Sequence, residues 1–178
     1  MYYSGIKPFS TENGPGVRVS LFVSGCRNAC EGCFQPETWD FQHGEPFDEA
    51  ARQQVMDDLA PDYIAGLTLL GGDPFEPENQ ADLIDFIRTV KQTYPDKTIW
   101  AFTGYHIDDE LAEGGKNHTD VTDEFLGYMD VVVDGPFILE KKSLMLPYRG
   151  SENQRIILMD ETRKSGEIVL SPLMDKRG

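Results

Sequence analysis

The sequence predicts an α/β fold, with a mainly parallel sheet in a single small domain. Short β-branched segments alternate along the chain with longer amphipathic segments, and this order is typical of β-α-β units. A chain of 178 residues, 39% of them hydrophobic, can bury one substantial core and is short enough for one domain. We therefore expect one domain over residues 1–178, with the weakest pattern in the tail from about residue 160.

Four strands are expected in chain order, at residues 17–23, 66–70, 98–102 and 130–134. Each is short, apolar and rich in β-branched or aromatic residues, as in VRVSLFV and TIWAF. The segments 155–159 and 167–170 are further candidates for strands.

Helices are expected between these strands, at residues 48–59 and 77–94 and in a region at 108–129 that is interrupted near Gly114 and Gly115. In the first two, the apolar positions available for the core are Val55, Met56, Leu59, Leu83, Ile84, Ile87 and Val90.

The unusual residues of the chain all follow a predicted strand. Three cysteines come after the first strand and Gly71-Gly72-Asp73 after the second. Thr103-Gly104-Tyr105 comes after the third, and Asp134-Gly135-Pro136 ends the fourth. The carboxyl ends of parallel strands meet at one edge of a sheet, where ligands usually bind. The sequence therefore predicts one site along that edge.

Cys26, Cys30 and Cys33 are the only cysteines and have the spacing C-x3-C-x2-C. Three thiolates can hold three irons of a 4Fe–4S cluster and leave the fourth iron open for a substrate. An odd number of cysteines in one short loop argues against a disulfide framework. A single zinc ion would need a fourth ligand, and no histidine stands at finger-like spacing from the cysteines. Zinc and uncommitted thiols remain alternatives.

Asp73 follows two glycines that allow a close approach of the backbone. Its carboxylate suits a cationic amine, which indicates a seat for an amino group. The alternative is a strand-to-helix turn in which Asp73 caps the helix.

The net charge is −15, from 31 acidic and 16 basic residues. Such a surface repels polyanions, so we expect no nucleic-acid partner. No apolar run approaches the roughly 20 residues that span a bilayer, and the polar N-terminus does not resemble a signal peptide. We expect a cytoplasmic protein without a membrane partner, whose acidity serves solubility or a basic protein partner.

Several longer runs resemble a known family. The C-x3-C-x2-C motif followed by Gly-Gly-acid is similar to the radical S-adenosylmethionine (SAM) enzymes. The match with the glycyl-radical-enzyme activases, and within them with the small activating proteins of the anaerobic (class III) ribonucleotide reductases, extends from about Asn13 to Ile157. It rests on the runs NGPGVR at 13–18, LFVSGC at 21–26, CF at 33–34, GGDP at 71–74, WAFTGY at 100–105, VDGPF at 133–137 and RGSENQ at 149–154.

The resemblance implies a partial, open (β/α) barrel of the radical SAM type. It implies one 4Fe–4S cluster on Cys26, Cys30 and Cys33, with SAM bound at the open iron. Reductive cleavage of SAM would then generate a glycyl radical on the anaerobic ribonucleoside-triphosphate reductase, the protein partner. Because the chain has no second cluster motif, the electron would come from flavodoxin or another low-potential donor.

The resemblance also suggests residues that contact the cofactors. Gly32 stands where many relatives have an aromatic residue and lets the backbone fold closely around the cluster, while Phe34 would pack near the adenine or in the core. Gly71, Gly72 and Asp73 would bind the SAM amino group, with Asp where much of the superfamily has Glu. Thr103 and Asp134 would bind the ribose or methionine part, although Asp134 is equally suited to begin a turn.

Two arginines have several open roles. Arg18 and Arg149 would meet the SAM carboxylate or an acidic partner, or form exposed salt bridges. The run from Arg149 to Gln154 would dock the reductase, or form a structural turn.

Other functions remain open at this point. One is another radical SAM enzyme, such as a different activase or a 7-carboxy-7-deazaguanine synthase-like enzyme. Another is a metal-binding module without catalysis. The short chain leaves little material to cover the site, and this favours a docked protein substrate.

Overall fold

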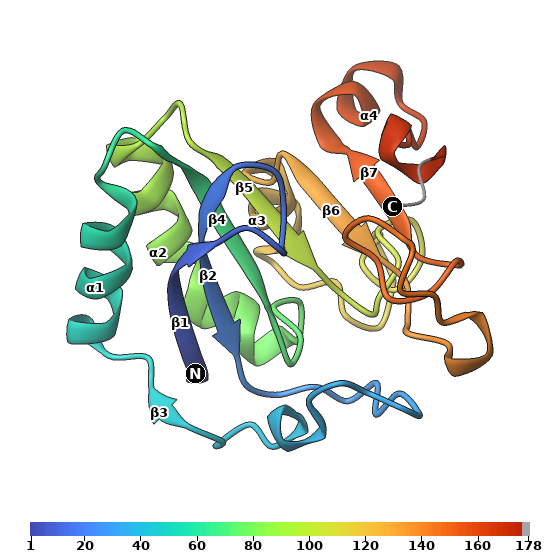
Figure 1. Ribbon diagram of the computed structural model, residues 1–178, viewed down its shortest axis with the longest axis horizontal. Coiled ribbons are helices and arrows are strands. Elements are labelled where there is room, and N and C mark those ends of the chain that lie inside the picture. The colour runs from blue at the N-terminus through green and yellow to red at the C-terminus, as the bar shows by residue number, and fades with distance from the viewer. Residues whose placement is uncertain (176–178) are drawn as a thin grey trace.

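One seven-stranded sheet organises the chain, with the strand order β3-β1-β2-β4-β5-β6-β7 (Figure 1). This computed structural model describes residues 1–175, so the last three residues of the predicted domain, 176–178, lie outside the described residues. The strands are β1 (Tyr2–Ser10), β2 (Val17–Val23), β3 (Glu45–Pro46), β4 (Ile64–Gly71), β5 (Thr98–Phe102), β6 (Val131–Asp134) and β7 (Arg155–Leu158).

The centre of the sheet is parallel and its flanks are antiparallel. Strands β2, β4, β5 and β6 pair in parallel, whereas β1, β3 and β7 join with antiparallel pairing. The four expected strands and the candidate at 155–159 are therefore confirmed, with small shifts at their ends. The expected strand at 167–170 is wrong. Leu170 makes only an isolated bridge with Ile157, and this segment forms no strand.

The helices are α1 (Glu49–Leu59), α2 (Pro77–Thr93), α3 (Thr122–Gly127) and α4 (Met159–Ser165), with short 3-10 turns at Pro36–Trp39, Leu139–Lys141 and Pro172–Asp175. Helix α1 begins where the Asp48 carboxylate accepts a hydrogen bond from Ala51 N at 2.9 Å. The expected helical region at 108–129 is mostly wrong. Only α3 is helical there, because tight turns around Gly114 and Gly115 replace the first part.

The two faces of the sheet differ, and this difference positions the site. Side chains of alternate strand residues, such as Val19, Leu67 and Ile99, pack with α1, α2 and α3 in the main core. Figure 1 shows α1 and α2 side by side against the sheet. On the opposite face, Phe22 and Phe102 are only partly buried and line a cleft. No helix in the described part of the chain is both long and apolar enough to cross a membrane.

Arg18 lies inside the sheet and is only 1% exposed. Its guanidinium donates to the Thr68 hydroxyl at 2.9 Å, and to the Thr98 hydroxyl and carbonyl at 2.8 and 2.9 Å. Burial lowers the pKa of Arg18 to about 10. The expected contact of Arg18 with SAM or an acidic partner is therefore wrong, because this side chain of β2 forms hydrogen bonds with β4 and β5.

Candidate functional site

A cleft of about 1000 Å³ lies over the open face of the sheet and reaches the carboxyl ends of the parallel strands. It is large enough for a cofactor-sized ligand with space left beside it. Nine of the ten predicted site residues line it, namely Cys26, Cys30, Gly32, Cys33, Phe34, Gly71, Gly72, Asp73 and Thr103. The structure thus brings together residues from three separate loops, as the strand-end argument predicts.

The cysteine loop, residues 24–35, leaves the end of β2 and forms one wall of this cleft. Its backbone is held by Gly25 N donating to Thr38 O at 2.7 Å and by Cys33 N donating to Cys30 O at 3.1 Å. Gly25 has φ +105°, and a side chain there would collide with the Phe41 ring. The three thiols are half-buried, and the loop holds them without forming any disulfide.

The spacing of the thiols bears on whether they bind a single ion. Three sulfurs around one tetrahedral zinc ion lie ~3.8 Å apart, given Zn–S bonds of about 2.3 Å. Among the described residues, the group with all ligand atoms within 4.8 Å of one another is His106, Asp109 and Glu110, and the cysteines do not form such a group. As they lie here, the three sulfurs are therefore not all close enough together to bind one ion.

Two of the thiols lie in surroundings that disfavour the thiolate when no metal is bound. Burial raises the pKa of the Cys26 thiol to about 12, and burial also raises the pKa of the Cys30 thiol. Thiols in such surroundings become thiolates when a cation binds them.

Gly71 and Gly72 bring the end of β4 against the cysteine loop. Gly72 N donates to Val23 O at 2.7 Å, and Asp73 N donates to Gly25 O at 2.8 Å. A Cβ on Gly71 would lie 2.5 Å from Val23 O, and one on Gly72 would lie 2.6 Å from Gly25 O. These glycines therefore allow the end of β4 to lie close to the chain's own backbone at Val23 and Gly25.

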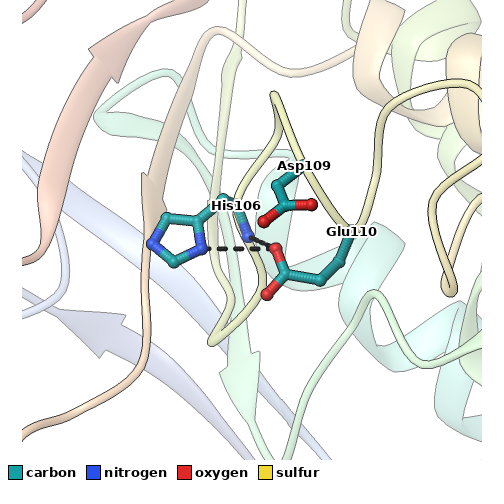
Figure 2. A group of neighbouring side chains, drawn as sticks. All are labelled: His106, Asp109 and Glu110. Atoms are coloured by element: carbon teal, nitrogen blue, oxygen red, sulfur yellow. Dashed lines mark hydrogen bonds and ion pairs between the residues drawn. The ribbon is translucent and has the colours of Figure 1, made fainter.

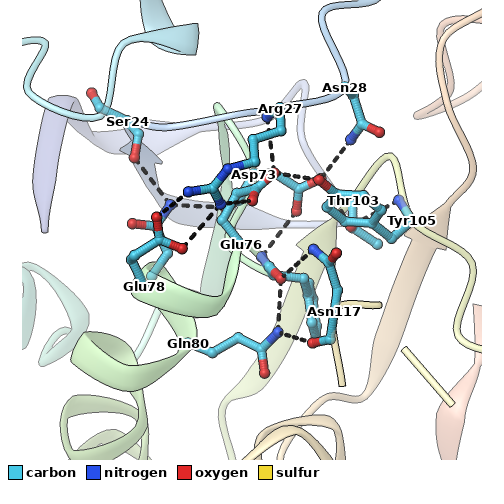
Figure 3. Close-up of polar contacts among 12 residues, drawn as sticks. Ser24, Arg27, Asn28, Asp73, Glu76, Glu78, Gln80, Thr103, Tyr105 and Asn117 are labelled. Atoms are coloured by element: carbon cyan, nitrogen blue, oxygen red, sulfur yellow. Dashed lines mark hydrogen bonds and ion pairs between the residues drawn. The ribbon is translucent and has the colours of Figure 1, made fainter. Parts of the chain in front are cut away.

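Asp73 is 1% exposed and its carboxylate is already well hydrogen-bonded. Oδ2 accepts from Gly104 N at 2.8 Å, from the Thr103 hydroxyl at 3.0 Å and from the Asn28 amide at 3.2 Å (Figure 3). Oδ1 accepts from Phe75 N at 2.9 Å. Burial raises the pKa of Asp73 to about 7, and the hydrogen bonds oppose this rise. Asp73 and Thr103 thus join the cysteine loop to the ends of β4 and β5.

Glu76, just before α2, forms a second anchor that sequence reasoning missed. Its fully buried carboxylate accepts from Arg27 N at 2.9 Å and from the Arg27 guanidinium at 2.7 Å (Figure 3). The Tyr105 hydroxyl also donates to Glu76, and burial and this carboxylate raise the pKa of Tyr105. Arg27 further pairs with exposed Glu78. The sequence signal for such an anchor was the presence of two polar residues, Arg27 and Asn28, between the first two cysteines.

Asp134 is the predicted site residue that does not line the cleft. Its carboxylate is fully buried and accepts from Arg155 at 2.8 and 2.7 Å and from Ile107 N at 2.9 Å. This geometry gives no support to a contact between Asp134 and SAM, and it assigns the residue to a buried ion pair.

Phe34 and Gly32 lie at the mouth of the cleft. Phe34 is 91% exposed, so the alternative in which it packs in the core is wrong. Gly32 has φ +76°, and a Cβ there would lie 2.8 Å from Leu139 Cδ1. Gly32 therefore allows residues 137–139 to pack against the cysteine loop.

The run from Arg149 to Gln154 uses its polar groups within the chain. The Gln154 amide oxygen accepts from Gly150 N at 2.8 Å and from Ser151 N at 3.1 Å. Arg149 is 9% exposed and donates to the Glu152 and Gln154 carbonyls at 3.2 and 3.0 Å. The expectation of an exposed ion pair at Arg149 is wrong, and these contacts support the structural turn, while Arg149 also lines the cleft.

His106, Asp109 and Glu110 form a small polar group beyond the end of β5 (Figure 2). Glu110 accepts from His106 N at 2.9 Å and contacts the ring Nδ1 at 3.2 Å. These contacts stabilise a turn, which accounts for the proximity of the three side chains.

Comparison with known proteins agrees with this geometry. Residues 12–157 match a family model described as a 4Fe-4S single cluster domain. The chain is 43% identical over 158 residues to the anaerobic ribonucleoside-triphosphate reductase-activating protein of Haemophilus influenzae, covering 88% of this chain and 97% of the relative.

Two further relatives carry the same name. The protein of Pasteurella multocida is 42% identical over 158 residues, covering 88% of this chain and 96% of the relative. The protein of Escherichia coli is 38% identical over 156 residues, covering 86% and 96%. The resemblance inferred from the short motifs is thus confirmed over most of the chain, and the chain belongs to the family of anaerobic ribonucleoside-triphosphate reductase-activating proteins.

Proposed function

We propose that this protein activates an anaerobic ribonucleoside-triphosphate reductase by generating a glycyl radical on it. The observation that carries this proposal is the set of three thiols, within the matched 4Fe-4S domain, on the wall of a cleft with space for a second ligand. Family membership supplies the class of partner. When bound, a 4Fe–4S cluster supplies the electron that cleaves SAM reductively.

The chain's own residues have three tasks in this proposal. Cys26, Cys30 and Cys33 would hold the cluster as thiolates, and one iron without a protein ligand would be left for SAM. Gly71 and Gly72 would present backbone groups to the SAM amino group, beside the Asp73 carboxylate. Phe34, exposed at the mouth of the cleft, would cover the adenine.

The proposal includes the type of fold and the source of the electron. The sheet, with one face covered by helices and the other lining the cleft, would be the partial, open barrel of radical SAM enzymes, and residues 1–178 would form one such domain. The external electron would come from flavodoxin or another low-potential donor, because all three cysteines are engaged by one cluster.

The test is anaerobic reconstitution with iron and sulfide, followed by addition of SAM, dithionite and the cognate reductase. We expect broad visible absorption that dithionite bleaches, and a glycyl doublet on the reductase in electron paramagnetic resonance. Cys26→Ala, Cys30→Ala and Cys33→Ala should each lose the four-iron cluster and the doublet. A colourless zinc protein, or a cysteine variant with full iron content and turnover, would contradict the proposal.

A further inference from the structure

A patch of exposed apolar side chains borders the cleft. Phe34 is 91% exposed, Leu144 is 90% exposed and Met145 is 54% exposed. Leu144 and Phe34 both line the cleft, and Leu139 reaches Gly32 in the cysteine loop. A concentration of exposed apolar surface at the mouth of a site typically marks an interaction with another molecule.

Most of this patch belongs to residues 137–149, the segment between β6 and β7, which we call the apolar arm. The arm is folded back on itself, because Ser143 N donates to Gly150 O at 3.2 Å and Glu152 N donates to Lys141 O at 3.0 Å. A bridge between Lys142 and Ser151 and the turn made by Arg149–Gln154 fix its base. The arm is therefore preorganised, which lowers the entropic cost of binding.

The arm also differs in charge from the rest of the molecule. The chain has 31 acidic and 16 basic residues, whereas residues 137–149 contain three basic residues and one acidic residue. Lys141, Lys142 and Glu140 are exposed and Arg149 is buried, so the exposed side chains of the arm carry a net charge of +1. The arm thus offers apolar contacts and positive charge on an otherwise acidic protein, and this combination favours an occupant with apolar and acidic side chains.

We propose that the apolar arm docks a segment of the reductase polypeptide that carries apolar and acidic residues beside the target glycine. This inference rests on the proposed function, since a glycine of another protein would enter the cleft that the arm lines together with the cysteines. It places the docking contacts on Leu139, Lys141, Leu144 and Met145. The polar run from Arg149 to Gln154 supports the arm from inside.

Leu144→Asp and Lys141→Glu test the arm through the Kd for the cognate reductase, measured by anaerobic calorimetry. We expect each substitution to weaken binding about 10-fold or more, because each removes a contact and adds a repelled charge. Lys141→Glu should also reduce the dependence of Kd on salt concentration. Lys141 is exposed, so this variant keeps the test valid even if Leu144→Asp does not fold.

Tyr63→Asp is the matched control. Tyr63 is 61% exposed and stacks on Phe9 with ring centroids 6.3 Å apart, just before β4 and thus at the opposite end of the parallel strands. Its substitution should leave Kd unchanged. Wild-type Kd in both arm variants, or equal weakening in Tyr63→Asp, would overturn the docking role.

The glycyl doublet separates this result from a failure of the proposed function. If the wild-type protein produces the doublet and the arm variants bind normally, only the arm assignment fails. If the wild-type protein produces no doublet on the reductase, the proposed function fails and the docking role fails with it. The visible absorption of the reconstituted cluster, unchanged in Lys141→Glu, shows that the site itself is intact.

Discussion

At the scale of residues, one carboxylate connects three loops. Asp73 receives hydrogen bonds from Asn28 in the cysteine loop and from Thr103 and Gly104 after β5. Gly104 provides the space for this contact, since a Cβ there would lie 2.2 Å from the Asn28 amide nitrogen. The position of the first two cysteines relative to the strand ends therefore depends on an asparagine and a glycine that bind no metal.

Gly104→Ala should have the same effect as Asn28→Ala, because the added methyl group displaces the Asn28 amide from Asp73. Each change should lower the free energy of unfolding by about 1–3 kcal/mol, the cost of a lost hydrogen bond to a buried carboxylate. In the double variant the second change should cost much less than it does alone. Urea unfolding of the four proteins measures this coupling, and strictly additive losses would contradict it.

The protonation of Asp73 predicts how stability varies with pH. Its pKa of about 7 in the folded protein lies above the ordinary value of 3.8, so between these values the folded state binds more protons than the unfolded state. Stability should therefore decrease as pH rises from about 4 to about 7, with a slope of up to about 1.4 kcal/mol per pH unit from this group. Urea unfolding of the iron-free protein across this range should show a shallower slope in Asp73→Asn. An identical slope in the variant would assign the effect to other groups.

Sequence reasoning identified the chemistry of the site residues better than their partners. Cysteine spacing and the glycines before Asp73 are local signals, and these residues do meet at the cleft. The contact expected for Arg18 was wrong and the one expected for Asp134 finds no support, because their partners come from segments far away in the sequence and both residues are buried. A charged residue at a strand end looks the same in a sequence whether it faces a ligand or an internal partner.

At the scale of elements, the connection from β4 to α2 anchors the cysteine loop. Gly72 lies against its backbone at Gly25, and Asp73 and Glu76 accept hydrogen bonds from its residues 28 and 27, respectively. Elements with a clear hydrophobic period, such as α2, were predicted closely. Strand β1 was not predicted, since Gly5 and Pro8 interrupt its pattern and its pairing with β2 is irregular.

Glu76→Ala and Glu78→Ala form a matched pair on this connection. Glu76 is buried, and its loss leaves Arg27 N and the Tyr105 hydroxyl without their acceptor, so we expect a cost of about 2–4 kcal/mol. Glu78 makes an exposed ion pair with the same arginine, and its loss should cost less than about 1 kcal/mol. Chemical denaturation and the iron content after reconstitution should both separate the two variants. Equal losses in the two proteins would remove Glu76 from the anchor.

Gly71→Ala and Gly114→Ala separate backbone strain from close approach. Both glycines have positive φ, +110° and +84°, but Gly114 has open space where a Cβ would lie. Gly114→Ala should cost about 1–2 kcal/mol from conformation alone. Gly71→Ala should cost at least about 2 kcal/mol more, because its methyl group meets Val23 O. Thermal unfolding measures the difference, and similar melting temperatures would argue against the close contact.

At the scale of the whole molecule, the core and the cleft wall that carries the cysteines are separate. The two apolar clusters contain no cysteine, and hydrogen bonds within the protein hold the cysteine loop in place. The α/β class and the parallel centre of the sheet were predictable, because they follow from local periodicity and the order of elements. The antiparallel flanks depend on long-range pairing, which local patterns do not encode.

Removal of iron by an anaerobic chelator should therefore leave a folded protein. We expect the far-ultraviolet circular dichroism to persist and thermal unfolding to remain a single cooperative transition, shifted to lower temperature by the loss of the bound ligand. Small domains that depend on a metal for folding lose their structure under the same treatment. Loss of secondary structure on chelation would show that the cluster is part of the fold.

The open face of the sheet has a consequence for how long a reactive species survives. The cleft is bordered by loops, by β1 and by the apolar arm, and no helix of the described chain contributes a residue to its lining. Water can enter whenever a partner is absent. If the arm does dock the reductase, water is excluded only for as long as the complex lasts. The dissociation rate of the complex, more than any residue of the cleft, then sets the time available for hydrogen abstraction.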